Sequence, residues 1–283
     1  MTAAVRRAAR KKLAAARRIV VKAGTNVVMR EEGGVALGRL FGLIESVAAL
    51  RKEGRDVLIV SSGAIGLGVQ RLRLKSRPIE LSLKQACAAV GQCRLMAVYE
   101  EGFGALNVPT AQVLLTEDDF ADPERFRNLS ATLGRLFSLG VVPILNENDV
   151  VSTAELETPG APRRRIFGDN DRLSALVMGH VEADALVILS DVDGLFTGHP
   201  TEDRRARLIP LVAGVTDRIV RYARGTGTRG RGGMETKLEA ARLATEAGGL
   251  AVVANGRTPH VLERLFAGEE LGTLFLPARR PRR

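Results

Sequence analysis

Short runs of apolar, often β-branched residues recur along the chain, each followed by glycine or polar turn residues. They occupy residues 19–21, 57–60, 108–115, 141–145, 185–189 and 250–254. Continuous apolar runs of this length are typical of strands buried on both faces of a sheet. Apolar residues repeat with helical spacing between them, which predicts helices over residues 35–52, 82–101, 123–139, 170–180, 234–247 and 258–266. This alternation predicts an α/β fold with a mainly parallel, doubly wound central sheet.

Three glycine-containing turns stand out, at residues 22–25, 61–68 and 230–234. The first two follow predicted strands and the third opens a predicted helix. In open α/β sheets, ligands bind beyond the carboxyl ends of the strands, where N–H groups at helix N-termini meet anions. One such turn alone is more often an ordinary tight turn. Three of them, two accompanied by a lysine, indicate an anion site.

Lys22 and Lys237 are the two lysines in these segments. Lys22 stands near the end of an otherwise apolar strand, where its ammonium group must reach water or a counter-ion. Lys237 falls in the first turn of a predicted helix, where the helix dipole disfavours a cation. Both placements are explained if an anion such as a phosphate binds between them.

Polar clusters also follow the predicted strands. In Gly168-Asp169-Asn170-Asp171 a helix cap needs one side chain, so the surplus of acceptors indicates a ligand. The cluster at residues 146–149 is either a turn or a site whose carboxylate pairs with a substrate ammonium group. Ser190 and Asp191 follow another strand and offer hydrogen-bond partners to a nucleotide, with an Asp-Gly turn as the alternative.

The formal net charge is +10, but the excess lies in the two termini. Residues 1–18 and 279–283 are rich in Arg and Lys and contain no acid, whereas the rest of the chain is close to neutral. The termini lack the interleaved aromatic residues of a stacking platform, which favours solvated tails over a nucleic-acid surface. A protein that binds nucleic acid through these tails is the competing hypothesis.

Other classes of protein find little support. Residues 225–230 match GxGxxG, but no convincing strand precedes them, so a dinucleotide oxidoreductase is disfavoured, and no GxxxxGK[ST] motif is present. The two cysteines and three histidines lack the spacing of a metal site or a catalytic triad. No apolar stretch is long enough to cross a membrane, so we expect a soluble cytoplasmic protein.

Six segments together resemble the amino-acid kinase family, and within it the enzymes that phosphorylate glutamate. They are residues 20–25, 60–65, 89–92, 146–149, 168–171 and 232–237, and the similarity extends from about Arg18 to Phe275. The resemblance implies a three-layer α/β/α sandwich, with ATP and Mg²⁺ as cofactors, L-glutamate as acceptor and γ-glutamyl phosphate as product, in proline biosynthesis. It also implies feedback inhibition by proline, a homo-oligomer and a glutamyl-phosphate reductase that takes the product.

The resemblance also implies roles for individual residues. Lys22, Lys237 and Asp171 are expected to be catalytic, with the lysines on the transferred phosphoryl group and Asp171 orienting them. The glutamate site is expected to comprise Ser62, Asp149, Asn170, Asn146 and Asp169. The ATP site is expected to comprise Lys22, Gly24, Ser190, Asp191, Arg231, Gly232, Gly233, Met234, Glu235, Thr236 and Lys237. No residue is expected to bind a metal ion directly.

The chain departs from the family pattern in three places. We expect a basic N-terminal extension at residues 1–17, a kinase domain at 18–276 and a basic tail at 277–283, without the C-terminal RNA-binding-like module of many bacterial members. Arg231 stands where the family often has a small residue. The loop at residues 157–167 is long, as in the kinase half of bifunctional pyrroline-5-carboxylate synthase. Among kinases, an acceptor such as aspartate is the nearest rival to glutamate.

Overall fold

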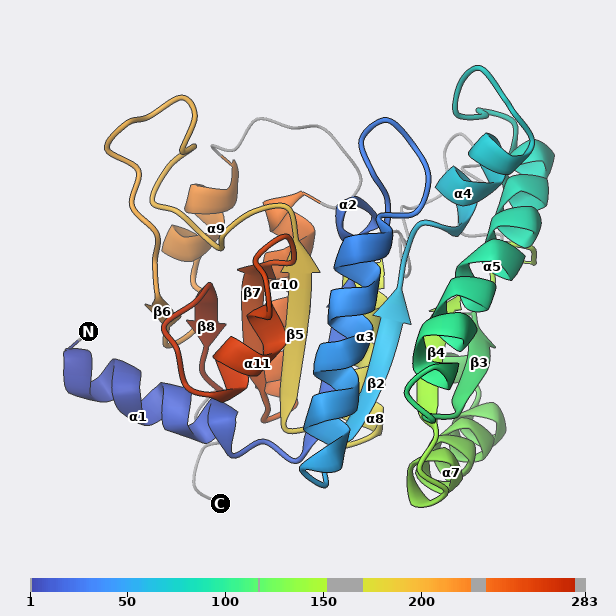
Figure 1. The fold of residues 1–283 in the computed structure, drawn as a ribbon. Helices are drawn as coiled ribbons and strands as arrows, with labels where there is room; N and C mark the ends of the chain where they lie inside the picture. The colour runs from blue at the N-terminus through green and yellow to red at the C-terminus, as the bar shows by residue number, and fades with distance from the viewer. Residues whose placement is uncertain (1, 117, 152–169, 225–232, 278–283) are drawn as a thin grey trace.

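The computed structural model describes residues 2–116, 118–151, 170–224 and 233–277. An eight-stranded sheet with the order β3-β4-β2-β1-β5-β7-β8-β6 forms its centre (Figure 1). The strands are β1 (Arg18–Ala23), β2 (Asp56–Ser61), β3 (Thr110–Leu115), β4 (Val142–Glu147), β5 (Ala185–Ser190), β6 (Leu211–Val212), β7 (Leu250–Asn255) and β8 (Thr273–Phe275). Neighbouring strands run parallel except β7 and β8, which run antiparallel. The predicted α/β class with a mainly parallel sheet is therefore confirmed.

Helices cover both faces of the sheet. The helices with sequence-predicted counterparts are α3 (Leu37–Lys52), α5 (Leu81–Gly104), α7 (Pro123–Ser138), α8 (Asn170–His180), α10 (Met234–Glu246) and α11 (Val261–Phe266). The remaining helices are α1 (Ala3–Ala14), α2 (Thr25–Val28), α4 (Ala64–Arg71), α6 (Asp118–Ala121) and α9 (Asp217–Arg224). In Figure 1, α3 and α11 lie in front of the sheet and α10 lies behind it.

Strand β1 shows how the sequence divides the core into two layers. Successive side chains of a strand point to opposite faces. Ile19, Val21 and Ala23 accordingly join the apolar cluster formed with α3, α5 and α11, whereas Val20 joins the cluster formed with α7, α8 and α10. Lys22 has the same parity as Val20, so its side chain leaves the sheet on the face that carries α8 and α10.

The N-terminal helix α1 is part of this core. Leu13 is fully buried, and Arg10 is only 3% exposed. The Arg10 guanidinium donates to the backbone oxygens of Pro210 and Gly272, at 3.3 Å and 3.2 Å. The expectation that the basic N-terminal side chains are simply solvated is therefore wrong for Arg10, because an apolar stripe of α1 docks onto the body. The domain boundary at residue 17 stays a prediction.

Two further expectations from the sequence can be compared with the structure. Residues 217–224, which precede the GxGxxG match, form helix α9 and not a strand, which removes the structural context that a dinucleotide fingerprint requires. The match itself, at residues 225–230, lies outside the described residues. None of the described helices is long and apolar enough to cross a membrane.

Candidate active site

Three buried charged side chains meet beyond the carboxyl end of β1. Lys22 Nζ lies 2.7 Å from Asp171 Oδ1, and Lys237 Nζ lies 3.2 Å from Asp171 Oδ2. Asp171 is 0% exposed and each lysine is 4% exposed. The three residues come from β1, α8 and α10, so the fold brings together the three residues that the sequence singled out as catalytic. One carboxylate thus holds two ammonium groups at the end of a strand, and pre-positioned cations of this kind can bind an anion such as a phosphate.

The two lysines control the ionisation of Asp171. Burial alone would raise the pKa of this carboxyl group, because a buried charge loses its hydration. The charges of Lys22 and Lys237, with hydrogen bonds from Lys22 and Thr236, outweigh that effect and lower the pKa from 3.8 to about 2. Asp171 is therefore ionised at neutral pH and can hold both ammonium groups in place.

The start of α10 contributes more than Lys237. Gly233 is the N-cap residue, and the Thr236 hydroxyl lies 2.9 Å from the Gly233 carbonyl oxygen and 3.0 Å from Asp171 Oδ2. Met234 is half-buried and Glu235 is exposed in the same first turn. The N-terminus of a helix attracts anions through its free N–H groups. Arg231 and Gly232, which were also predicted to bind ATP, lie outside the described residues.

A cluster of side-chain amides lies next to the charged group. Asn170, the residue before Asp171, places Nδ2 2.6 Å from the Ser61 carbonyl oxygen, 3.0 Å from Ser62 Oγ and 2.9 Å from Asn146 Oδ1. Asn146 Nδ2 in turn donates to Gln92 Oε1 at 2.9 Å. We call Ser62, Gln92, Asn146 and Asn170 the amide cluster. It brings together three of the residues predicted to bind glutamate.

Of the two other residues of the predicted glutamate site, the structure describes only Asp149. Asp149 lies in the turn after β4, where it is half-buried. The Asn148 N–H in the same turn donates to the Leu115 carbonyl oxygen at 2.8 Å, which ties the turn to β3. Asp169 lies outside the described residues.

The end of β5 forms the other side of the site. Asp191 Oδ1 accepts a hydrogen bond from Ser190 Oγ at 3.0 Å, and Asp191 Oδ2 accepts one from Asn26 Nδ2 at 2.6 Å. Burial raises the pKa of Asp191, but these hydrogen bonds and the charge of Lys237 together lower it. A Cβ on Gly24 would lie 3.0 Å from the Leu189 carbonyl oxygen and 3.6 Å from Lys22 Nζ. Glycine therefore keeps the space between β1 and β5 open.

Two residues of this region were given no role from the sequence. Asn26 stands in the short helix α2 and holds Asp191. Gln92 belongs to a motif of the resemblance, but no role was assigned to it. A signal for Gln92 exists in the pattern, because it interrupts the apolar stripe of α5 with an amide.

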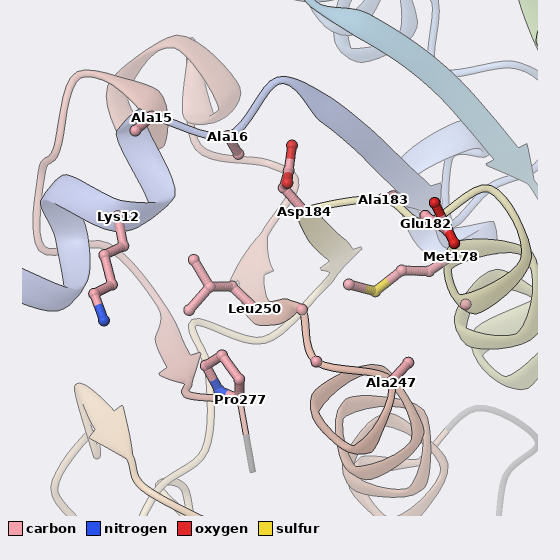
Figure 2. Close-up of a pocket in the computed structure, with 13 residues that line it drawn as sticks. Lys12, Ala15, Ala16, Met178, Glu182, Ala183, Asp184, Ala247, Leu250 and Pro277 are labelled. Carbon is pink, nitrogen blue, oxygen red and sulfur yellow. The ribbon is translucent and has the colours of Figure 1, made fainter. Parts of the chain in front are cut away.

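A separate cavity of about 480 Å³ lies at the amino ends of β5 and β7 (Figure 2). Its lining includes Met178, Ala247, Leu250 and Pro277. Asp184 also lines it, but its carboxylate accepts the backbone N–H groups of Arg17 and Arg18, at 2.8 Å and 2.9 Å. That carboxylate therefore has a structural role, and the predicted chemistry lies at the other end of the strands.

The fold and these residues define the class of protein. A model of the amino acid kinase family matches residues 17–255, and the chain belongs to that family. The fold is shared with solved structures at low identity: a structure of isopentenyl phosphate kinase superposes with a TM-score of 0.62 at 18% identity, covering 91% of this chain and 99% of that one.

Within the family, the chain is similar to glutamate 5-kinases. It is 49% identical to the glutamate 5-kinase of Geobacter sp. (strain M21) over 263 residues, which is 93% of this chain and 68% of that protein. It is 48% identical to that of Gloeobacter violaceus over 262 residues, covering 92% of this chain and 69% of that protein. The chain thus spans about two thirds of the length of these relatives.

Proposed function

We propose that this chain transfers the γ-phosphoryl group of ATP to the γ-carboxylate of L-glutamate, forming γ-glutamyl phosphate and ADP in the first step of proline biosynthesis. The observation that carries this proposal is the meeting of Lys22 and Lys237 at Asp171, directly beside the amide cluster. The 49% identity to a glutamate 5-kinase supports glutamate as the acceptor.

The chemistry explains why these residue types suffice. A γ-carboxylate has an unperturbed pKa of about 4.3, so at neutral pH it is already an anionic nucleophile and needs no general base. One of its oxygens forms a bond to the γ-phosphorus while the bond to the bridging oxygen of ADP breaks. The site must overcome the repulsion between an anionic acceptor and a polyanionic donor, and pre-positioned cations do this.

The geometry supports separate roles for the residues around the transferred phosphoryl group. We assign Lys22 and Lys237 to the phosphoryl oxygens, and Asp171 to holding both lysines. Glutamate would lie against the amide cluster and the turn that carries Asp149. The nucleotide would lie between the end of β5, at Ser190 and Asp191, and the N-terminus of α10.

We expect Mg²⁺ to enter with the nucleotide. Mg²⁺ in kinases is commonly held by substrate phosphates, water and one or two carboxylates rather than by a protein cage. Among the described residues, the Asp171 carboxylate is engaged by both lysines, so in this proposal it positions them and does not bind the ion. When bound, the ion would neutralise charge on the phosphates.

A hydroxamate assay tests the proposal. With ATP, Mg²⁺ and hydroxylamine, an acyl phosphate is trapped as a coloured hydroxamate. We expect the product with L-glutamate and not with L-aspartate or other acids of a panel, and we expect Lys22→Ala to abolish it. A hydroxamate with aspartate alone would assign a different acceptor, and none above background with any acid would reject the kinase.

Four further proposals follow from the family rather than from the described geometry. Proline is proposed as a feedback inhibitor, and a homo-oligomer as the assembled state. The labile acyl phosphate requires a reductase that consumes it, which we propose to be a glutamyl-phosphate reductase. The cytoplasm is the proposed location.

A further inference from the structure

Gln92 is a buried amide on the apolar stripe of a long helix. The buried residues of α5 recur at helical spacing and are otherwise apolar or small, apart from the Tyr99 hydroxyl, which pairs with Ser61 Oγ at 3.0 Å. Gln92 is only 9% exposed, and its Nε2 has no hydrogen-bond partner among the described residues. A buried donor without a partner costs about 1–3 kcal/mol, so its presence calls for an explanation.

The hydrogen bonds of its neighbour determine which atom of Gln92 is free. The backbone N–H of Glu147 donates to Asn146 Oδ1 at 3.0 Å, which fixes the Asn146 amide because a backbone N–H can only donate. Asn146 Nδ2 must then be the atom that faces Gln92, and it donates to Gln92 Oε1 at 2.9 Å. The polar atom of Gln92 that lacks a partner among the described residues is therefore Nε2, whose NH₂ group can only donate a hydrogen bond.

Close packing of α4 and α5 brings this donor to the acceptor site. A Cβ on Gly91 would lie 1.7 Å from the Ala64 carbonyl oxygen, so only glycine allows α5 to approach the start of α4 this closely. Ala64 follows Ser62 by two residues, and Ser62 Oγ is hydrogen-bonded to Asn170. Gln92 thus lies beside the loop that we assign to glutamate.

The order of the amides indicates which part of the substrate Gln92 meets. In space, the group of Asp171 and its two lysines lies next to Asn170, Asn170 contacts Asn146, and Asn146 contacts Gln92. The γ-carboxylate must lie at the lysines to be phosphorylated, so the opposite end of glutamate lies towards Gln92. That end carries an ammonium group, which an N–H donor repels, and an α-carboxylate, which it attracts.

We propose that Gln92 Nε2 donates a hydrogen bond to the α-carboxylate of the acceptor and that Gln92 is a specificity-determining residue. This inference rests on the proposed function. Asn146 fixes the orientation of the Gln92 amide, so the donor is already in place when the substrate arrives. A site built to hydrogen-bond a substrate group discriminates strongly against analogues that lack it, because the buried donor is then left unpaired.

Steady-state kinetics of Gln92→Met test this proposal. We expect KM for L-glutamate to rise about 10-fold to 100-fold, as for the loss of a hydrogen bond to a charged group, with kcat and the KM for ATP little changed. The preference for L-glutamate over L-isoglutamine, in which the α-carboxylate is an amide, should fall by a similar factor in kcat/KM. Gln70→Met, on the exposed face of α4, is the matched control and should change neither quantity.

A second variant keeps the proposal testable if Gln92→Met unfolds. Gln92→Glu can still accept from Asn146 but places a carboxylate against the α-carboxylate, so KM for glutamate should rise at least as far while the thermal unfolding midpoint stays close to that of the wild type. Folded variants with an unchanged KM would overturn the role of Gln92 and leave the kinase intact. A wild-type protein inactive on glutamate would instead overturn the proposed function, and this inference with it.

Discussion

Lys22 Nζ and Asp171 Oδ1 form an ion pair 2.7 Å long that joins the central strand β1 to the first turn of α8. Both side chains are almost completely buried, so water screens the pair little. The carboxylate also holds Lys237, which ties α10 to the same point. The pair therefore has two consequences that can be measured separately, one for catalysis and one for stability.

Removal of the Lys22 ammonium group should impair chemistry more than substrate binding. For Lys22→Ala we expect kcat to fall on the order of 10²-fold to 10³-fold, because one pre-positioned cation on the transferred phosphoryl group is lost. The hydroxamate assay at saturating ATP and glutamate measures this. Lys52→Ala, at the exposed end of α3, is the control and should retain wild-type turnover. A Lys22→Ala enzyme within a few-fold of wild type would contradict the assigned role.

Neutralising Asp171 should destabilise the fold. Asp171→Asn leaves two buried ammonium groups without their carboxylate, and loss of one partner from a buried ionic group costs about 3–5 kcal/mol of unfolding free energy. Urea denaturation at pH 7 measures the change. Glu101→Gln, at an exposed position of α5, should change stability by less than about 0.5 kcal/mol. Equal effects of the two substitutions would show that the ionic group contributes nothing.

The lowered pKa of Asp171 predicts how stability depends on pH. The folded-state pKa, about 2, is below the ordinary value of 3.8, so the folded state binds this proton more weakly than the unfolded state does. The carboxylate thus contributes about 2 kcal/mol above pH 4, and this contribution is lost as pH falls from about 4 to 2. Urea unfolding between pH 6 and 2 should show the stability gap between wild type and Asp171→Asn narrowing by that amount. A gap independent of pH would contradict it.

Gly91 should tolerate no side chain, in contrast to a glycine on an open helix face. Gly91→Ala would place a Cβ 1.7 Å from the Ala64 carbonyl oxygen, so α4 and α5 must separate, at a cost of about 1–3 kcal/mol. Gly42→Ala, inside α3 with no atom within 4 Å of the new Cβ, should instead stabilise by up to about 1 kcal/mol. Urea denaturation of both variants is the measurement, and effects of the same sign would refute the packing argument.

Helix α1 should contribute to the stability of the kinase fold. Leu13→Ala removes a fully buried side chain and should cost about 2–5 kcal/mol, whereas Val5→Ala, at a position 42% exposed, should be nearly neutral. Thermal or urea unfolding compares them. If Leu13→Ala were as stable as wild type, α1 would be a dispensable extension, as the basic composition of residues 1–17 suggested.

The long apolar strands were predictable, and the short elements were not. The six predicted strands occur within a few residues of their expected ends, because continuous apolar runs flanked by turn residues identify buried strands well. Strands β6 and β8 have two and three residues, too few to show a period. The residues of helix α4 were predicted to form a turn because they include Gly66 and Gly68. Both positions favour glycine because α4 packs closely on its neighbours there.

The ends of the strands predicted where the site lies, but the sequence could not supply its contacts. The glycine turns and Lys22 pointed to the carboxyl edge of the sheet, and parallel strands bring such residues to one edge. That Asp171 binds both lysines depends on how α8 and α10 cross the sheet, which no local pattern records. The polar Gln92 in the apolar stripe of α5 was visible in the sequence, but its contact with Asn146 was not, since the two residues are distant in the sequence and only the packing of α5 brings them together.

The alternation of side chains across the sheet has a consequence for how this enzyme could be altered. Lys22 lies on the face of the sheet that carries α8 and α10, whereas Asn146 contacts Gln92 of α5 on the opposite face. Asn170, at the carboxyl ends of the strands, connects the two groups through its hydrogen bond to Asn146. Under the proposed assignment, the residues for the phosphoryl group and those for the acceptor thus lie on opposite faces of the sheet. A directed-evolution library confined to β4 and α5 could therefore change the acceptor specificity while the residues assigned to the phosphoryl group stay the same.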